Sequence, residues 1–142
     1  GIAIEQDFIK NIATIEDCLD KIINFEAERI DKIRERISNG LEEFMPVESV
    51  DKNRFEQELI YYIEKIDFSE EKSRSSQHCK YFLETIEVDE ISKGRTLNFI
   101  SQEMGREINT LGAKAYHSDI QRLIVMMKDE LEKIKEQTAN IV

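Results

Sequence analysis

A single proline, Pro46, and five glycines are the strongest helix breakers in this chain of 142 residues. Proline and glycine are the residues that a helix interior tolerates least. Glutamate, lysine, isoleucine and leucine are abundant between them. This composition favours a few long helices over a fold rich in turns or strands.

The spacing of apolar residues supports that reading. Steps of four and three, the signature of one helical stripe, connect Phe8, Ile12, Ile15, Leu19 and Ile22. The stripe resumes with Ile30, Ile33, Ile37, Leu41 and Phe44. Met45–Pro46 is expected to stop it, and Asn39–Gly40 is a point where the helix could fray or kink. Residues 24–29 either join two helices or continue one, and the pattern permits both.

Three further helices are expected before the C-terminal segment. One begins at Asp51, a suitable N-cap, and reaches Ile66. The next takes Ser69 as its cap, with acidic residues in its first turn, and runs to about Ile86. After an acidic loop over 87–94, a third begins near Arg95 or Thr96, and Gly112 is expected to end it.

The C-terminal segment has the most regular pattern. A heptad seam, with alternating steps of four and three, consists of Ile120, Ile124, Met127, Leu131, Ile134, Thr138 and Ile141. The predicted fold is therefore all-α, with long antiparallel helices in a bundle or coiled-coil-like arrangement joined by short loops. We expect a hairpin or long helix over 1–46 and a helical domain over 47–142. Long helices with narrow seams also suggest contacts with other chains.

The charge and the cysteines limit the function classes. A net charge of -10 repels nucleic acid on average, so a nucleic-acid role requires local cations, a metal or another domain. No apolar run approaches the ~20 residues of a membrane span, and the first residues do not resemble a signal peptide. Cys18 and Cys79 are far apart and lack metal-site spacing. We expect a cytoplasmic protein with reduced thiols and no membrane partner.

Two polar stripes carry the candidate chemistry. Glu103 and Glu107 are four residues apart and project from one helix face, which Thr110 and Lys114 extend. Gln102, Arg106 and Asn109 form the adjacent stripe of the same helix. Glu71, Arg74 and His78 make a similar stripe on the helix over 69–86. Carboxylates and an imidazole from two helices are a usual way for a bundle to hold a divalent cation, here Mn or Mg.

Simpler interpretations remain for each motif. A Glu pair at this spacing occurs on most surface helices, and a lone helical histidine is more often a core or boundary residue than a ligand. Charged residues off the seam are typical of a solvated face. A mobile polar surface is expected for Ser73, Ser75 and Ser76. Cys79 follows His78 directly, so their side chains diverge and do not form a catalytic dyad. Core and boundary positions, rather than base-stacking platforms, are expected for Tyr61 and Tyr62.

The C-terminal half also resembles a known family. The segments GRTLNFISQEMGREINTLGAKA, IQRLIVMMKDELEKIKEQTANIV and VDKNRFEQELIYYIEKIDFSEE resemble the C-terminal helical region of the YicC/YloC family of bacterial proteins. The resemblance covers residues 47–142 well and 1–46 loosely. It implies an endoribonuclease that needs a divalent metal and assembles as a homo-oligomer, with a hexamer suggested. Family members carry an additional N-terminal region, so we expect this chain to be a C-terminal fragment.

The family's polar pattern falls on the stripes described above and on Arg95. For a metal-assisted nuclease we expect the following roles for these residues. The expected metal ligands are Glu103, Glu107, His78 and Glu71. The expected catalytic residues are Glu103, Glu107, His78 and Arg106. The expected RNA phosphate-binding residues are Arg74, Arg95, Lys114, Gln102 and Asn109. The chain departs from the family pattern at Lys72 and Ser75, where apolar residues are usual, and at Asn98, Ala113 and Ala115.

The leading functional hypothesis is metal-assisted hydrolysis of RNA phosphodiester bonds. Two alternatives stay open. In the first, the chain is a non-catalytic oligomerisation module whose polar stripes form ion pairs between helices and whose seam over 120–141 drives assembly. In the second, it is an adaptor that delivers RNA to another nuclease.

Overall fold

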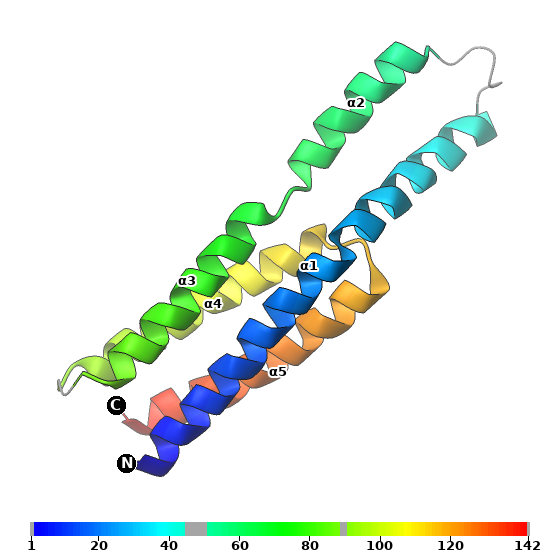
Figure 1. The fold of residues 1–142 in the computed structure, drawn as a ribbon. Coiled ribbons are helices and arrows are strands. Elements are labelled where there is room, and N and C mark those ends of the chain that lie inside the picture. Colours follow the sequence, from blue (N-terminus) through cyan, green and yellow to red (C-terminus); the bar gives the residue numbers. More distant parts are fainter. Residues whose placement is uncertain (1, 45–50, 89–90, 142) are drawn as a thin grey trace.

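The computed structural model describes residues 2–44, 51–88 and 91–141, with the side chains of 41–44 excepted. These residues form helices and no strand, which confirms the all-α prediction. The helices are α1 (Ile2–Phe44), α2 (Lys52–Lys65), α3 (Ser69–Ile86), α4 (Lys93–Lys114) and α5 (Ser118–Ile141). Figure 1 shows their arrangement.

The N-terminal residues form one continuous helix. Residues 24–29 continue α1 rather than joining two helices, and the helix passes through Asn39–Gly40 without a break. The helix stop expected at Met45–Pro46 and the domain boundary expected after residue 46 lie outside the described residues.

Local capping explains most of the other helix ends. The Asp51 carboxylate accepts hydrogen bonds from the backbone N–H groups of Asn53 and Arg54 at 3.1 and 3.3 Å, which confirms it as the cap of α2. The prediction of Ser69 as the α3 cap is wrong. Phe68 holds the cap position because its ring is buried, and the Ser69 hydroxyl donates instead to Asp67 at 2.8 Å.

The α4 boundaries also differ from the prediction. The helix begins at Lys93, two residues before Arg95, and it continues past Gly112 to Lys114. Leu111 and Ala115, on either side of Gly112, are both fully buried. Packing of these side chains outweighs the weak helix preference of a single glycine.

Four helices share one core. The first half of α1, with α3, α4 and α5, forms a bundle in which neighbouring helices are antiparallel and α1 lies diagonally opposite α4. The predicted apolar stripes supply this core, which includes Phe8, Ile12, Ile15, Ile22, Phe82, Ile100, Met104, Ile108, Ile124 and Met127. Leu131 and Ile134 of the α5 seam are buried in the same core. The seam therefore packs within the chain, and the expectation that it drives assembly is wrong.

The remaining part of α1 leaves the bundle and runs antiparallel to α2. We call residues 30–44 of α1, together with α2, the arm (Figure 1). Leu59 is the buried residue of α2, whereas Ile60 and Tyr61 are exposed, so the arm has little core of its own. None of the described helices is long and apolar enough to cross a membrane.

Candidate functional site

The structure brings His78 of α3 and Glu107 of α4 together. The imidazole Nδ1 lies 2.8 Å from one carboxylate oxygen of Glu107 and 3.0 Å from the other. The Glu107 side chain is 8% exposed and that of His78 is 28% exposed. A carboxylate only accepts hydrogen bonds, so this contact places a proton on Nδ1 and leaves Nε2 for another partner. The pair thus has the geometry of an oriented histidine base.

Ser75 is a third member of this cluster. It is fully buried, and its hydroxyl donates to the second oxygen of Glu107 at 3.4 Å. The prediction of a mobile polar surface for Ser75 is therefore wrong. Ser75 precedes His78 by three residues, so one face of α3 presents both side chains to Glu107. This spacing was the signal that sequence reasoning passed over.

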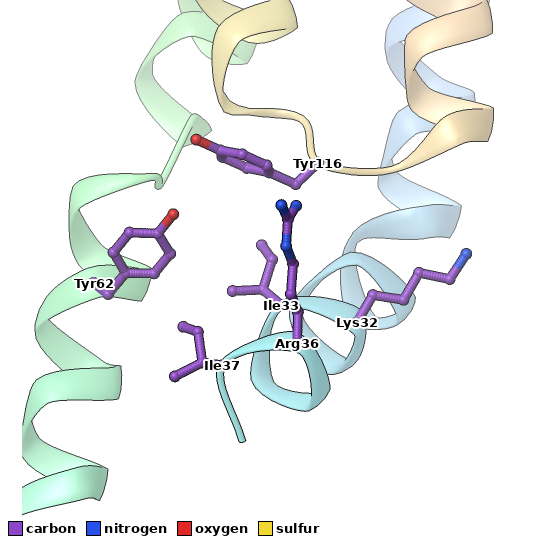
Figure 2. A pocket seen from close by; sticks show the side chains of 6 residues that line it. All are labelled: Lys32, Ile33, Arg36, Ile37, Tyr62 and Tyr116. Carbon is purple, nitrogen blue, oxygen red and sulfur yellow. The ribbon is translucent and has the colours of Figure 1, made fainter. Parts of the chain in front are cut away.

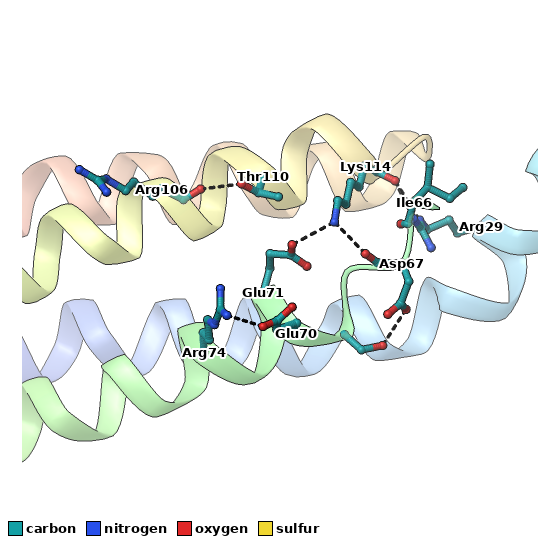
Figure 3. A network of polar contacts seen from close by, with 10 residues as sticks. Arg29, Ile66, Asp67, Glu70, Glu71, Arg74, Arg106, Thr110 and Lys114 are labelled. Carbon is teal, nitrogen blue, oxygen red and sulfur yellow. Dashed lines mark hydrogen bonds and ion pairs between the residues drawn. The ribbon is translucent and has the colours of Figure 1, made fainter. Parts of the chain in front are cut away.

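A second polar contact joins the same helices two turns away. The Lys114 ammonium lies 3.0 Å from a carboxylate oxygen of Glu71, and it also donates to the backbone carbonyl of Asp67 at 2.9 Å (Figure 3). The other Glu71 oxygen is buried without a hydrogen-bond partner among the described residues. Seven residues separate Glu71 from His78 and Glu107 from Lys114, so two antiparallel helices bring both pairs into contact.

The arginines beside these pairs are exposed. Arg74 pairs with Glu70 on α3, and Arg106 lies 3.6 Å from Glu103 on α4. The Arg106 side chain is 80% exposed. Exposed ion pairs contribute about 0–1 kcal/mol, so these guanidinium groups can exchange a carboxylate for a phosphate at little cost. Figure 3 shows that Arg74 and Arg106 come from the two helices that carry the buried pairs.

Several predicted residues do not join the His78–Glu107 contact. Glu103 interacts with Arg106, one turn before Glu107. Gln102 and Asn109 are exposed on the adjacent face of α4. Arg95 is exposed about 18 Å from Glu107 along the helix axis. Their roles in RNA binding stay predictions.

The residues present fit a metal ion only in part. His78 and Glu107 offer nitrogen and oxygen donors of the kind that Mn accepts. Within the described ranges, however, no group of three or more His, Cys, Asp or Glu side chains converges to hold an ion. Glu107 already interacts with His78 and Ser75, and Glu71 with Lys114. The described residues by themselves therefore do not bring together a complete metal site.

A buried arginine that the sequence prediction missed fixes the end of the polar stripe. Arg29 of α1 is 2% exposed and donates to the carbonyls of Ile66, Lys114 and Ala115. Its guanidinium carbon lies 4.0 Å from the centre of the Phe68 ring. Burial lowers the pKa of Arg29 below its usual value. The only signal in the sequence was an arginine at a position of α1 where the apolar stripe continues.

Two other titratable side chains, His117 and Cys79, are buried and contribute to the structure of the bundle. The His117 Nδ1 accepts hydrogen bonds from the backbone N–H groups of Asp119 and Ile120 at 3.1 and 3.4 Å, so this buried histidine caps α5. Cys79 is fully buried, and burial, followed by the charges of Glu16 and Glu107, raises its pKa to about 12. A thiol with that pKa is not a nucleophile near neutral pH.

Comparison with known proteins identifies relatives. Residues 22–142 match the family model described as "Endoribonuclease YicC-like, C-terminal". The chain is 33% identical over 142 residues to a probable endoribonuclease YicC from Clostridioides difficile, covering 99% of this chain and 48% of that protein. It is 37% identical over 98 residues to a probable endoribonuclease YicC from Haemophilus influenzae, covering 66% of this chain and 32% of that protein.

The chain thus spans about half the length of one curated relative, and its match covers about a third of the other. The family match includes α2 to α5 and about half of α1, and with them the His78–Glu107 and Glu71–Lys114 pairs. On the extent of the family match and the identity across nearly its whole length, this chain belongs to the endoribonuclease YicC-like family and carries that family's C-terminal domain.

Proposed function

We propose that this chain is the C-terminal helical part of an endoribonuclease that hydrolyses RNA phosphodiester bonds. The observation that carries the proposal is the partly buried hydrogen bond between His78 and Glu107, with exposed arginines on both helices beside it. The names of the relatives support the reaction class. Metal dependence and the individual catalytic roles are part of the proposal.

In this mechanism His78 transfers the proton. Glu107 accepts the Nδ1 proton and so holds the ring with Nε2 available, and Ser75 holds Glu107 in turn. The neutral Nε2 takes a proton from the attacking oxygen nucleophile, and the resulting imidazolium, stabilised by Glu107, returns a proton to the leaving oxygen. Histidine suits both steps because its ordinary pKa lies near neutral pH.

The exposed arginines position the phosphate. Arg74 and Arg106 present guanidinium forks that match the geometry of phosphate oxygens, and each gives up only a weak surface ion pair. Their positive charge also stabilises the charge that develops on the phosphate in the transition state. These local cations offset the repulsion expected from a net charge of -10. Recognition by shape in single-stranded or looped RNA fits such contacts better than reading of individual bases.

We also propose a requirement for a divalent cation, Mn or Mg. Glu107 would be one of its ligands, and the remaining donors would come from Glu103, Glu71, water, RNA or another chain. In this mechanism His78 would not bind the ion, because its Nδ1 donates to Glu107 and its Nε2 transfers the proton. Such an ion supplies charge neutralisation at a phosphate. The proton transfers above require only the side chains of this chain. Metal content of the purified protein tests this part separately: it should fall with the Glu107→Gln substitution and stay unchanged with His78→Gln.

The cleavage test uses a labelled RNA that contains a loop. The RNA is incubated with this chain alone and, separately, with this chain fused to the part of a relative that it does not match. We expect Glu107→Gln and His78→Gln each to lower the cleavage rate at least about 100-fold, the lower end of the range for general acid–base groups. The matched control is Glu84→Gln, because Glu84 is an exposed residue of α3. This substitution should leave the rate unchanged. Undiminished cleavage by both site variants would exclude the proposed role of the pair.

A homo-oligomer, with the hexamer that the resemblance suggests, is a further part of the proposal. Phe99 of α4 and Val125 and Met126 of α5 are large apolar side chains exposed on the bundle. Such exposure is typical of surfaces that contact other proteins. Sedimentation of the chain tests the assembly, and RNA cleavage by the purified protein alone would exclude a purely adaptor role.

A further inference from the structure

A pocket with a volume of about 510 Å3 lies at the base of the arm, where α1, α2 and the connection between α4 and α5 meet (Figure 2). Its lining consists of Lys32, Ile33, Arg36, Ile37, Tyr62 and Tyr116. The volume is within the range of sites that bind small molecules or single nucleotides. None of the residues in the proposed catalytic pair contributes to it.

Arg29 positions the segments that carry these side chains. Ile33 and Arg36 follow Arg29 by one and two helical turns, so they lie on the face of α1 that Arg29 directs toward the α4–α5 connection. Arg29 holds the carbonyls of Lys114 and Ala115, the two residues before Tyr116. The pocket therefore begins where the polar stripe of α3 and α4 ends.

Tyr116 has an unusual backbone conformation. Its φ angle is 48°, the left-handed region, which disfavours a bulky side chain and which glycine or asparagine normally occupies. Residues held in this region concentrate at binding sites, where the surrounding structure maintains the strain. Here the conformation directs the Tyr116 ring over the pocket, opposite Arg36 (Figure 2).

The two tyrosines form one side of the pocket. Tyr62 is half-buried, and hydrogen bonding with the Tyr116 side chain, with burial second, raises its pKa above the usual value. Tyr61, its neighbour in sequence, is 62% exposed, and its ring lies beneath the Lys65 ammonium at 5.1 Å, outside the pocket. The aromatic pair of the pocket is thus Tyr62 with Tyr116. The core or boundary position expected for Tyr61 is wrong, whereas Tyr62 does lie at a boundary.

The remaining lining residues define the chemistry of the ligand. Ile33 and Ile37 give an apolar wall, whereas Arg36 and Lys32 contribute positive charge. Lys32 also pairs with Glu28 at 3.5 Å, but both side chains are about half exposed and the pair is weak. Aromatic rings and an apolar wall suit the flat face of a nucleobase, and a guanidinium suits the attached phosphate.

We propose that this pocket is a subsite for one nucleotide of single-stranded RNA, with the base against Tyr62 and Tyr116 and its phosphate at Arg36. The choice of RNA rests on the proposed function. The pocket adjoins the end of the polar stripe, so a strand bound at His78–Glu107 has a path along α3 and α4 to the arm. Base–aromatic stacking does not require a particular base, and the subsite therefore anchors the strand without selecting a sequence.

The test measures binding of a labelled, short single-stranded oligoadenylate to this chain by fluorescence anisotropy, in the presence of a chelator. We expect Tyr62→Leu and Arg36→Gln each to weaken binding about tenfold, the loss of one stacked base or one phosphate contact. Tyr62→Phe keeps the ring and should bind within about threefold of the unmodified chain. The matched controls are Tyr61→Leu and Arg34→Gln, the neighbouring residues outside the pocket, which should bind within about twofold.

Two further measurements show whether the pocket binds a nucleotide of an RNA strand or a free nucleotide. Free AMP should compete with the oligonucleotide only weakly, and a duplex of the same sequence should bind equally well to the unmodified and Tyr62→Leu chains. Tight AMP binding without any effect of the substitutions on the oligonucleotide would assign the pocket to a free nucleotide and overturn the proposal. Equal binding by Arg36→Gln and Arg34→Gln would also overturn it, and because Arg36 is exposed, its replacement leaves the fold intact.

Failure of the subsite and failure of the proposed function are distinguishable. If the subsite exists and the catalytic assignment is wrong, the pocket variants weaken oligonucleotide binding while His78→Gln and Glu107→Gln leave cleavage unchanged. If the catalytic assignment is right and the subsite is wrong, the catalytic variants lose cleavage while the pocket variants bind normally.

Discussion

Replacing Arg29 with methionine tests whether one buried guanidinium holds the arm on the bundle. Methionine retains much of the aliphatic stem but donates no hydrogen bond. The substitution leaves the carbonyls of Ile66, Lys114 and Ala115 without their donor and removes the cation above the Phe68 ring. Two of these carbonyls belong to the end of α4 and one to the end of α2, where a positive charge also stabilises the helix dipole.

The expected loss is large for one residue. Hydrogen bonds to a charged group contribute about 1.5–3 kcal/mol each, and part of that gain offsets the desolvation of the guanidinium. Removing one partner from a buried charged cluster costs about 3–5 kcal/mol. We therefore expect Arg29→Met to lower the free energy of unfolding by about 3–5 kcal/mol, a large share of the roughly 5–15 kcal/mol typical of a domain. Arg29→Lys keeps the charge but not the fork, so we expect about half that loss.

Urea unfolding followed by circular dichroism measures the effect. A loss of this size corresponds to a fall of about 2 M in the urea midpoint. Arg34→Met is the matched control on the same helix. Arg34 is exposed, and its pair with Glu56 at 2.9 Å contributes at most about 1 kcal/mol. If the Arg29→Met and Arg34→Met midpoints differ by less than about 0.5 M, the inferred role of Arg29 is wrong.

Two further predictions concern buried titratable side chains. His117→Ala removes the cap of α5 and a ring packed 5.3 Å from that of Phe25, and should lower the free energy of unfolding by about 1–2 kcal/mol. His117→Asn keeps a cap acceptor and should recover about 1 kcal/mol of this loss in the same urea assay, and equal destabilisation by both variants would contradict the capping role. The pKa of Cys79, raised from 9.0 to about 12, means that the folded state holds its proton where the unfolded state has lost it. Stability is therefore complete below pH 9 and should fall by up to about 1.4 kcal/mol per pH unit between pH 9 and 12. Cys79→Ala should reduce that slope in pH-dependent urea unfolding, and an unchanged slope would contradict the assignment.

The parts of the fold that depend on local spacing were predictable from the sequence. Apolar stripes such as Phe8 to Ile22 repeat every three or four residues, so a helix and its buried face follow from them directly. The contact between His78 and Glu107 was predictable for a similar reason. Each residue belongs to a polar stripe, and the antiparallel helices α3 and α4 bring the two stripes together. The sequence did not decide whether α1 was one helix or two. Residues 24–29 contain no proline or glycine, and in the structure they continue α1.

Arg29 itself was not predictable, because its partners are backbone carbonyls. Any residue provides a carbonyl, so nothing in the identity of Ile66, Lys114 or Ala115 marks them as acceptors for a distant arginine. The same reasoning applies to Phe68, which displaces Ser69 from the cap position because the fold buries its ring. Both outcomes are set by contacts between elements far apart in the chain, and tertiary packing outweighs the local preference.

The polar residues of α3 and α4 divide into two groups with different consequences for function. Glu107 is buried, Glu71 is partly buried, and both have fixed partners, so their contacts stabilise the interface between the helices, and Glu107 holds His78 in one orientation. Arg74 and Arg106 are exposed in weak ion pairs, so they contribute little to stability and remain able to bind an anion. In the proposed function, groups of the second kind bind the RNA phosphate and offset the strongly negative net charge. In that proposal His78, held by Glu107, acts on a phosphate that the exposed cations hold over it, so the two groups act together at one interface.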